Sequence, residues 1–188
     1  MYRITRNPFV LFALAPAYVF LVQQRFSSRA VGKRERRGVY WTNGALAAIA
    51  VLMSLTIGIK AYALIQLPVI VFAAATGVWL FYVQHQFEDT YWARQDGWSF
   101  HAGALQGATH YDLPGVLRWF TANIGIHHVH HLASRIPSYR LREALAEHPE
   151  LRDVGRLTLR QSLKCFRLAL WNEESRKLVA FRDLRTLA

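Results

Sequence analysis

Residues 61–83, AYALIQLPVIVFAAATGVWLFYV, contain no charged side chain, and residues 41–59, WTNGALAAIAVLMSLTIGI, contain none either. A bilayer core about 30 Å thick needs roughly 20 apolar residues in helical form. Both runs meet that length, and only Lys60 lies between them. We therefore predict two transmembrane helices with a very tight connection, forming an antiparallel hairpin. Two buried helices of a soluble core are the alternative, which the length of the second run disfavours.

The charges of the chain are segregated from its apolar runs. The chain is 53% hydrophobic and has a formal net charge of +11. The basic residues just before the hairpin are Arg25, Arg29, Lys33, Arg34, Arg36 and Arg37. Arg94 and a basic tail follow the hairpin, whereas its tip carries Lys60 only. This distribution predicts an integral membrane protein with both ends facing the cytoplasm. Aromatic residues expected at that interface are Tyr40, Trp41, Trp79 and Tyr82.

The stretch 8–22 is apolar but short, and it contains Pro16. Its length favours an interfacial or re-entrant segment over a span, and it lacks a convincing signal-peptide pattern. The single cysteine, Cys165, excludes an internal disulfide and fits a reducing compartment. We predict an all-α membrane protein in three parts: an interfacial segment and basic linker at 1–40, a transmembrane hairpin at 41–83, and a helical cytoplasmic cap at 84–188.

All eight histidines lie in the predicted cap. His127, His128, His130 and His131 form one cluster, and His85 stands where the second span leaves the membrane. If residues 117–132 are helical, His127, His130 and His131 share a face, whereas His128 points elsewhere. Three neutral imidazoles on one face can bind iron, zinc, copper or nickel.

Less specific interpretations apply to the other polar residues of the cap. His85 needs no ligand role to occur at a membrane interface. Glu88 and Asp89 would share its face if the helix continues, where they could orient the His85 ring, bind metal, or form a solvated acidic pair. Isolated histidines on a solvated surface are expected at His101, His110 and His148.

Beyond the histidines, several stretches resemble bacterial acyl-lipid desaturases in order and spacing. They are FYVQHQFEDTYW at 81–92, LP at 113–114, WF at 119–120, NIGIHHVHH at 123–131, RIPSY at 135–139, LTLRQSL at 157–163 and LWNE at 170–173. The resemblance covers nearly the whole chain.

In that family, histidine boxes on the cytoplasmic face hold two iron atoms, which activate O2 to place a cis double bond in an acyl chain. The resemblance implies that His127, His130 and His131 form the third box and that His85 is a further iron ligand. On the same analogy, Gln84 and Asn123 support the ligands.

The resemblance also implies a location in a bacterial inner membrane, and it implies partners. An acyl lipid would reach the metal from the bilayer, and electrons would come from a ferredoxin- or cytochrome-type donor. A basic cytoplasmic surface would attract an acidic donor, or it would bind membrane lipids with anionic head groups. The family's role is in fatty acid biosynthesis and lipid metabolism.

The family pattern also requires a first and a second histidine box, yet the chain has no histidine before His85. We consider three explanations: a C-terminal fragment of a longer reading frame, one half of a split enzyme, and an inactive remnant. The fragment is favoured, because the resemblance begins abruptly at residues 2–8. In each case we expect the isolated chain to bind iron incompletely and to turn over nothing.

Two other functions are compatible with a histidine cluster in a membrane protein. A histidine-box hydroxylase or ketolase would bind its metal through the same kind of histidine cluster, although residues 84–88 and the tail after Pro137 favour the desaturase. A membrane metal-binding remnant is the non-catalytic alternative. The basic residues are spread along the chain rather than clustered on one face, so we expect no nucleic acid partner. In the tail, Thr158 is a candidate N-cap for an amphipathic helix carrying Leu159, Leu163, Phe166 and Leu170.

Overall fold

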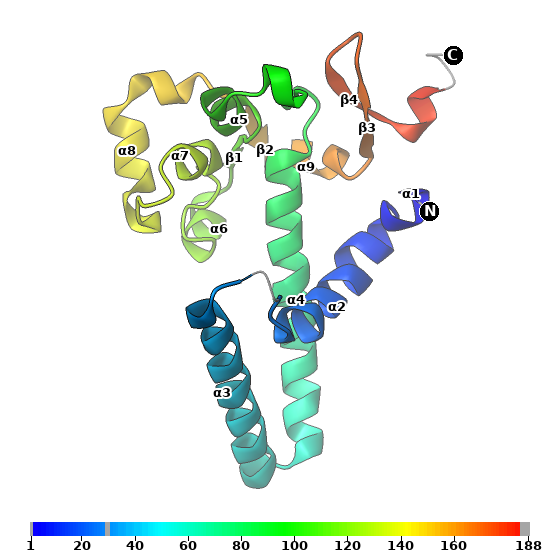
Figure 1. Ribbon diagram of the computed structural model, residues 1–188, viewed down its shortest axis with the longest axis vertical. Coiled ribbons are helices and arrows are strands. Elements are labelled where there is room, and N and C mark those ends of the chain that lie inside the picture. Colours follow the sequence, from blue (N-terminus) through cyan, green and yellow to red (C-terminus); the bar gives the residue numbers. More distant parts are fainter. Residues whose placement is uncertain (1, 29–30, 185–188) are drawn as a thin grey trace. The chain divides into compact units, whose positions relative to one another are not determined.

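The computed structural model describes residues 2–28 and 31–184 (Figure 1). The chain divides into two compact units, Met1–Trp79 and Leu80–Ala188, each of which is described by itself. The α-helices are α1 (Tyr2–Thr5), α2 (Ala15–Leu21), α3 (Lys33–Ile57), α4 (Ile59–His85), α5 (Phe100–Gln106), α6 (Gly115–Phe120), α7 (His127–Leu132), α8 (Leu141–Glu147) and α9 (Leu159–Cys165). The strands are β1 (His110–Asp112), β2 (Arg156–Thr158), β3 (Leu168–Asn172) and β4 (Lys177–Ala180).

The two long helices, α3 and α4, are separated by Gly58 alone, which confirms the predicted tight connection (Figure 1). Helix α4 begins in the first unit, and its last residues, 80–85, belong to the second. The turn differs from the sequence prediction by two residues. Gly58 has a φ of 87°, a conformation that costs little only for glycine, so the chain reverses there. Lys60 instead lies in the first turn of α4.

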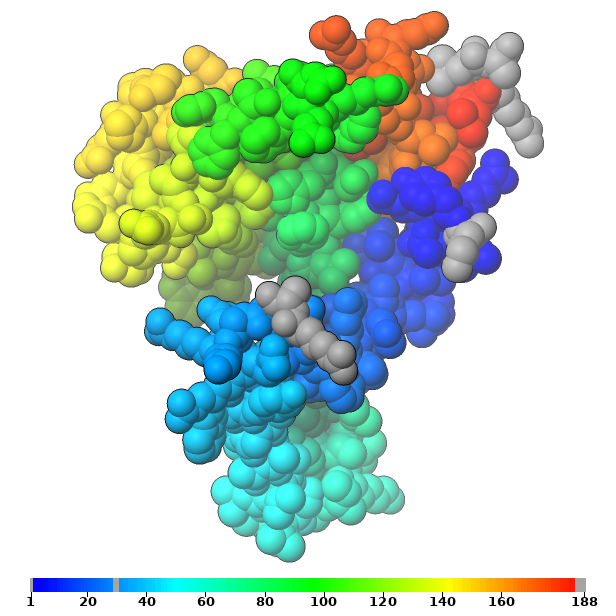
Figure 2. All heavy atoms as spheres, viewed as in Figure 1, coloured from blue at the N-terminus to red at the C-terminus, as the bar shows by residue number. Residues whose placement is uncertain are grey.

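Both helices are long and apolar enough to cross a membrane. Their apolar side chains are exposed rather than packed in a core: Leu55 is 80% and Phe72 74% exposed. Figure 2 shows the cyan end of the hairpin with no other segment lying over it in this view. The helices of a soluble core would instead bury this surface.

The segment before α3 is helical in short pieces. A π-helical turn at Val10–Leu14 leads into α2, and a 3₁₀ turn follows at Gln23–Arg25. Arg25 and Asn43 exchange two hydrogen bonds, which fasten the end of this segment to α3. The apolar helical stretch is shorter than either candidate span.

The second unit contains strands as well as helices, so the expectation of an all-α protein is wrong in this part. Among the described residues, β1 pairs with β2 in parallel, and β3 pairs with β4 as an antiparallel hairpin. The protein is nevertheless mostly helical. A small core holds α7 and α8 together through Ile126, Val129, Leu141 and Leu151.

The predicted helix over residues 117–132 is interrupted. Helix α6 ends at Phe120, and Ala122 and Asn123 adopt positive φ values of 52° and 58° before α7 begins. Gly125 then passes so close to β1 that a Cβ atom would overlap the carbonyl oxygen of Tyr111. The chain leaves the helical path because the backbone here packs against a strand.

The helix predicted after Thr158 is present as α9 but is shorter than predicted. Thr158 forms the expected N-cap in a capping box with Gln161, whereas α9 ends at Cys165, so Leu170 belongs to β3. The buried face of α9 also differs from the prediction. Leu163 is exposed, and Ser162 is buried, where its hydroxyl lies 2.9 Å from the Tyr111 hydroxyl. The helix is therefore anchored to β1 by a polar contact.

Candidate metal site

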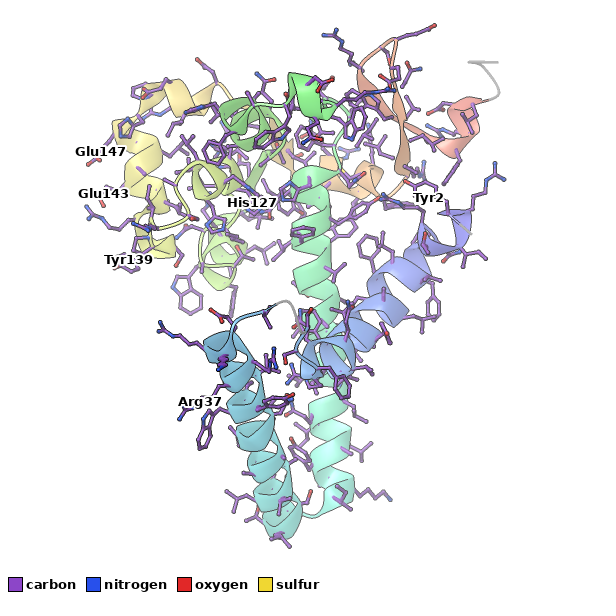
Figure 3. All side chains as sticks on the ribbon, in the orientation of Figure 1. Tyr2, Arg37, His127, Tyr139, Glu143 and Glu147 are labelled. Atoms are coloured by element: carbon purple, nitrogen blue, oxygen red, sulfur yellow. The ribbon has the colours of Figure 1, made fainter. Side chains whose placement is uncertain are left out.

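Three histidine side chains meet between the end of α4 and α7. The Nε2 atom of His127 lies 3.0 Å from Nε2 of His85 and 3.1 Å from Nε2 of His131. The Nε2 atoms of the remaining pair, His85 and His131, lie 3.3 Å apart. Figure 3 shows His127 on the side of α7 that faces the end of α4. Three ring nitrogens thus converge on one point.

His85 is oriented by a backbone acceptor. Its Nδ1 lies 2.9 Å from the carbonyl oxygen of Gly107, at the end of α5. A carbonyl only accepts, so Nδ1 carries the proton and Nε2 keeps its lone pair toward the other two histidines. Phe81, one turn earlier in α4, packs its ring 5.0 Å from the same imidazole. Hydrogen bonding and packing together fix the direction of this ring.

The environment keeps His127 and His131 neutral. Burial, followed by the neighbouring imidazoles, lowers the pKa of His127 to about 3. Burial and then His85 also lower the pKa of His131. The Nδ1 atom of His127 is buried without a hydrogen-bond partner. Two of the three converging rings, His127 and His131, are therefore held in the uncharged form that can bind a metal cation.

These residues fit a bound metal cation. Imidazole–metal bonds of about 2.0–2.1 Å, meeting at 90° to 109°, separate the two nitrogens by about 2.9–3.4 Å. All three nitrogen separations in the cluster fall in that range. A proton can bridge only one pair of these atoms, whereas a metal cation can accept all three lone pairs.

His130, the fourth predicted ligand, does not join this group. Its ring stacks on that of His127, with 5.7 Å between the ring centroids. Among the described residues, the histidines whose ring nitrogens lie within 4.8 Å of one another are His85, His127 and His131. Successive helical residues are rotated by about 100°, so His130 and His131 lie on opposite sides of His127. His85 approaches from the side of His131.

His128 points away from the cluster, as predicted. Its Nε2 donates to the carbonyl oxygen of Leu151 at 2.9 Å, and its side chain is fully buried. Burial, and then His110, lowers its pKa to about 4. His110 is half-buried in β1 with its ring 5.9 Å from that of His128, so it is not the solvated surface residue that was expected. His101 and His148 are exposed.

The predicted supporting residues act on the backbone around the cluster. Gln84 is buried and donates from Nε2 to the carbonyl oxygen of Ile124, at 2.9 Å, in the turn before α7. Asn123 lies in the same turn and donates to the carbonyl oxygen of Ser138 at 3.3 Å. Gln84 thus ties the end of α4 to the approach of α7, while Asn123 holds the following loop.

The acidic pair lies apart from the cluster. Helix α4 ends at His85, so Glu88 and Asp89 do not continue its face. Both carboxylates contact Lys177 Nζ, at 3.4 Å and 2.9 Å, and the backbone of Glu88 accepts from Leu178. These residues attach the β3–β4 hairpin to the segment that follows the site.

Gly107 is the functional residue that sequence reasoning missed. Nothing in the local sequence marks its carbonyl as the acceptor for His85, because the two residues are 22 positions apart. A Cβ atom at Gly107 would overlap the Gly103 carbonyl oxygen, so the tight turn at the end of α5 requires glycine. This requirement can be recognised only in the structure.

The comparisons with known proteins identify the family of the chain. The family model described as fatty acid desaturase matches residues 1–162. A protein named fatty acid desaturase from Bacillus subtilis (strain 168) is 42% identical over 184 residues, which make up 98% of this chain and 52% of that protein. The chain thus spans about half the length of this curated relative, and no solved structure matches it. With a family match over most of its residues, the chain belongs to the fatty acid desaturase family.

Proposed function

We propose that these residues form part of the iron centre of a membrane acyl-lipid desaturase. The single observation that carries this proposal is the convergence of Nε2 atoms from His85, His127 and His131 within 3.3 Å of one another. Family membership supports an oxidoreductase acting on a fatty acyl chain.

The described residues would supply part of a two-iron site. His85, His127 and His131 would hold one iron ion, and His130, on the other side of His127, would serve the second. No histidine precedes His85 in the chain, and the chain corresponds to 52% of its curated relative. The remaining ligands would therefore come from the first and second histidine boxes of a complete enzyme. By this account the 188 residues alone are inactive.

When bound, the iron centre would supply O2 activation for removal of two hydrogens from adjacent carbons of the acyl chain. Those two hydrogens, with two electrons and two protons from outside, reduce O2 to two water molecules and leave the double bond. The residues of this chain orient the centre: Gly107 fixes the His85 ring, and Leu151 holds α7 through His128.

Insertion in a membrane is supported by α3 and α4. Their apolar side chains are exposed along lengths sufficient to span a bilayer. A hairpin with both ends in the cytoplasm of a bacterium would place His85 at the mouth of the second span. The acyl chain of a membrane lipid could then reach the site without crossing water.

Electrons would come from a soluble ferredoxin- or cytochrome-type donor. The net charge of +11 favours an acidic protein as that partner, because opposite charges steer association. Rim charges act mainly on the association rate, so raised salt should slow reduction of the complete enzyme.

Lipid analysis of a desaturase-deficient host tests this proposal. A complete enzyme that contains these residues should produce cis-unsaturated acyl chains, and the 188-residue chain alone should produce none. His85→Ala in the complete enzyme should abolish the product, whereas the matched exposed variant His101→Ala should retain it. A hydroxylated acyl chain with no new double bond would overturn the assignment.

A further inference from the structure

The start of α3 presents cationic and aromatic side chains on one face. Lys33, Arg36, Arg37, Tyr40 and Trp41 together line an open hollow of about 340 Å³. Their spacing is i, i+3, i+4, i+7 and i+8, which places them on one side of an α-helix. The hollow is therefore built by a single helix and does not depend on the histidine site.

Acidic residues are scarce along the sequence around this face. Glu35 is the only acidic residue before Glu88, and about 100° of rotation per residue places it roughly 200° from Lys33, on the opposite side of α3. Lys33 and Arg37 are exposed, and Figure 3 shows Arg37 projecting outward from the helix. A negatively charged ligand would meet this face.

The aromatic residues mark the boundary with the apolar part of α3. Tyr40 is 60% and Trp41 70% exposed, and the helix carries no further charged side chain from there to Ile57. Tyrosine and tryptophan favour the level of lipid head groups because each ring has an apolar body and a polar tip. The basic residues of this face precede Tyr40 by one to two helical turns, so they would lie nearer the cytoplasm, close to the lipid phosphates.

We propose that this face of α3 is a binding site for the phosphate of an anionic phospholipid. Lys33 and Arg37 contact the phosphate oxygens, while Tyr40 and Trp41 lie along the glycerol and the first acyl carbons. Free inorganic phosphate shares the charge but lacks the apolar part. The inference rests on the proposed membrane insertion of α3, and it is independent of metal binding and catalysis.

Native mass spectrometry of the full chain, released from an uncharged detergent, measures this binding directly. Short-chain phosphatidylglycerol should bind to one saturable site about tenfold more tightly than phosphatidylcholine of equal chain length. Lys33 and Arg37, which the proposal places against the phosphate, should each contribute about a fivefold gain in affinity. Arg37→Gln should therefore weaken phosphatidylglycerol binding about fivefold, and Lys33→Gln combined with Arg37→Gln about 25-fold.

Arg34→Gln is the matched control, because Arg34 is exposed and adjacent yet does not line the hollow. It should change the affinity less than twofold, and Arg37→Lys, which keeps the charge, should bind like the wild type. Circular dichroism of each variant checks that the helices are retained. Equal losses from Arg34→Gln and Arg37→Gln, equal binding of phosphatidylcholine, or displacement of the lipid by millimolar inorganic phosphate would each overturn the proposal. Alkaline carbonate extraction of membranes tests membrane insertion separately.

Discussion

The Nδ1–H group of His85 donates to the carbonyl oxygen of Gly107, and this bond leaves the opposite nitrogen of the ring facing His127 and His131. A metal-binding histidine commonly donates its other N–H group to a backbone carbonyl, which fixes the tautomer and the ring direction. The turn at the end of α5 thus positions a residue of α4 for a contact with α7.

Moving the carbonyl of Gly107 should weaken metal binding without removing a ligand. Gly107→Ala introduces a Cβ atom against the Gly103 carbonyl oxygen and forces the turn to shift. Loss of such a supporting bond costs about 10–100-fold in metal affinity. Titration with Co2+, followed by its absorbance, measures the change. Gly97→Ala is the control, since its Cβ would meet only Ala93 at 3.9 Å, and an equal effect of the two variants would contradict this role.

The neighbouring residues His130 and His131 should behave differently in the isolated chain. His131→Ala removes one of the three converging nitrogens, so Co2+ affinity should fall at least tenfold. His130→Ala leaves all three in place and should change the affinity less than threefold. In a complete desaturase both variants should lose activity. A larger loss of Co2+ affinity in His130→Ala than in His131→Ala would show that the converging triad is assigned incorrectly.

Acid should destabilise the metal-free protein. The pKa of His128 is about 4 when folded, against an ordinary value of 6.5, so the unfolded chain binds more protons between these values. The stability that comes from keeping His128 uncharged is fully present above about pH 6.5 and is lost as the pH falls toward 4. Thermal unfolding in detergent from pH 7.5 to 4 measures the trend.

Replacing His128 by leucine should make that pH dependence shallower without abolishing it, because the pKa of His127 is also lowered, to about 3. The variant should also lose about 1–3 kcal/mol of stability at neutral pH, since the Leu151 carbonyl oxygen loses its buried donor. His101→Leu, at an exposed position, is the control and should retain the wild-type pH trend. A protein that becomes more stable as the pH falls would contradict this account.

The close approach of α7 to β1 should make Gly125 irreplaceable. In Gly125→Ala the new methyl group would overlap the Tyr111 carbonyl oxygen, so we expect a loss of about 2 kcal/mol or more, as overpacking usually costs 1–3 kcal/mol. Gly115→Ala meets nothing within 4 Å and should be nearly neutral. Equal unfolding temperatures for the two variants would show that the backbones are not in contact.

The sequence predicted the elements that depend on local pattern. Two uncharged apolar runs specified α3 and α4, and the i, i+4 spacing of His127 and His131 placed them on one face. Helical periodicity could not say from which side His85 would approach. The choice of His131 over His130 as its partner therefore required the structure.

The missed features depend on contacts between distant segments. Strand β1 is three residues long and pairs with β2, so His110 lies opposite Arg156, a partner 46 positions away. The same packing interrupts the helix expected before α7, because Gly125 must pass beside Tyr111. Propensity predicted helix through Leu170, but that residue pairs with Val179 in the β3–β4 hairpin. Tertiary contacts override local preference at each of these points.

The most direct test of the central claim is an anaerobic Fe2+ titration of the purified 188-residue chain by isothermal calorimetry, with His85→Ala and His101→Ala in parallel. We predict one Fe2+ bound per chain for the wild type and for His101→Ala, and at least a tenfold weaker affinity for His85→Ala. Absence of Fe2+ binding, or equal affinity in all three proteins, would contradict a metal site built on His85, His127 and His131.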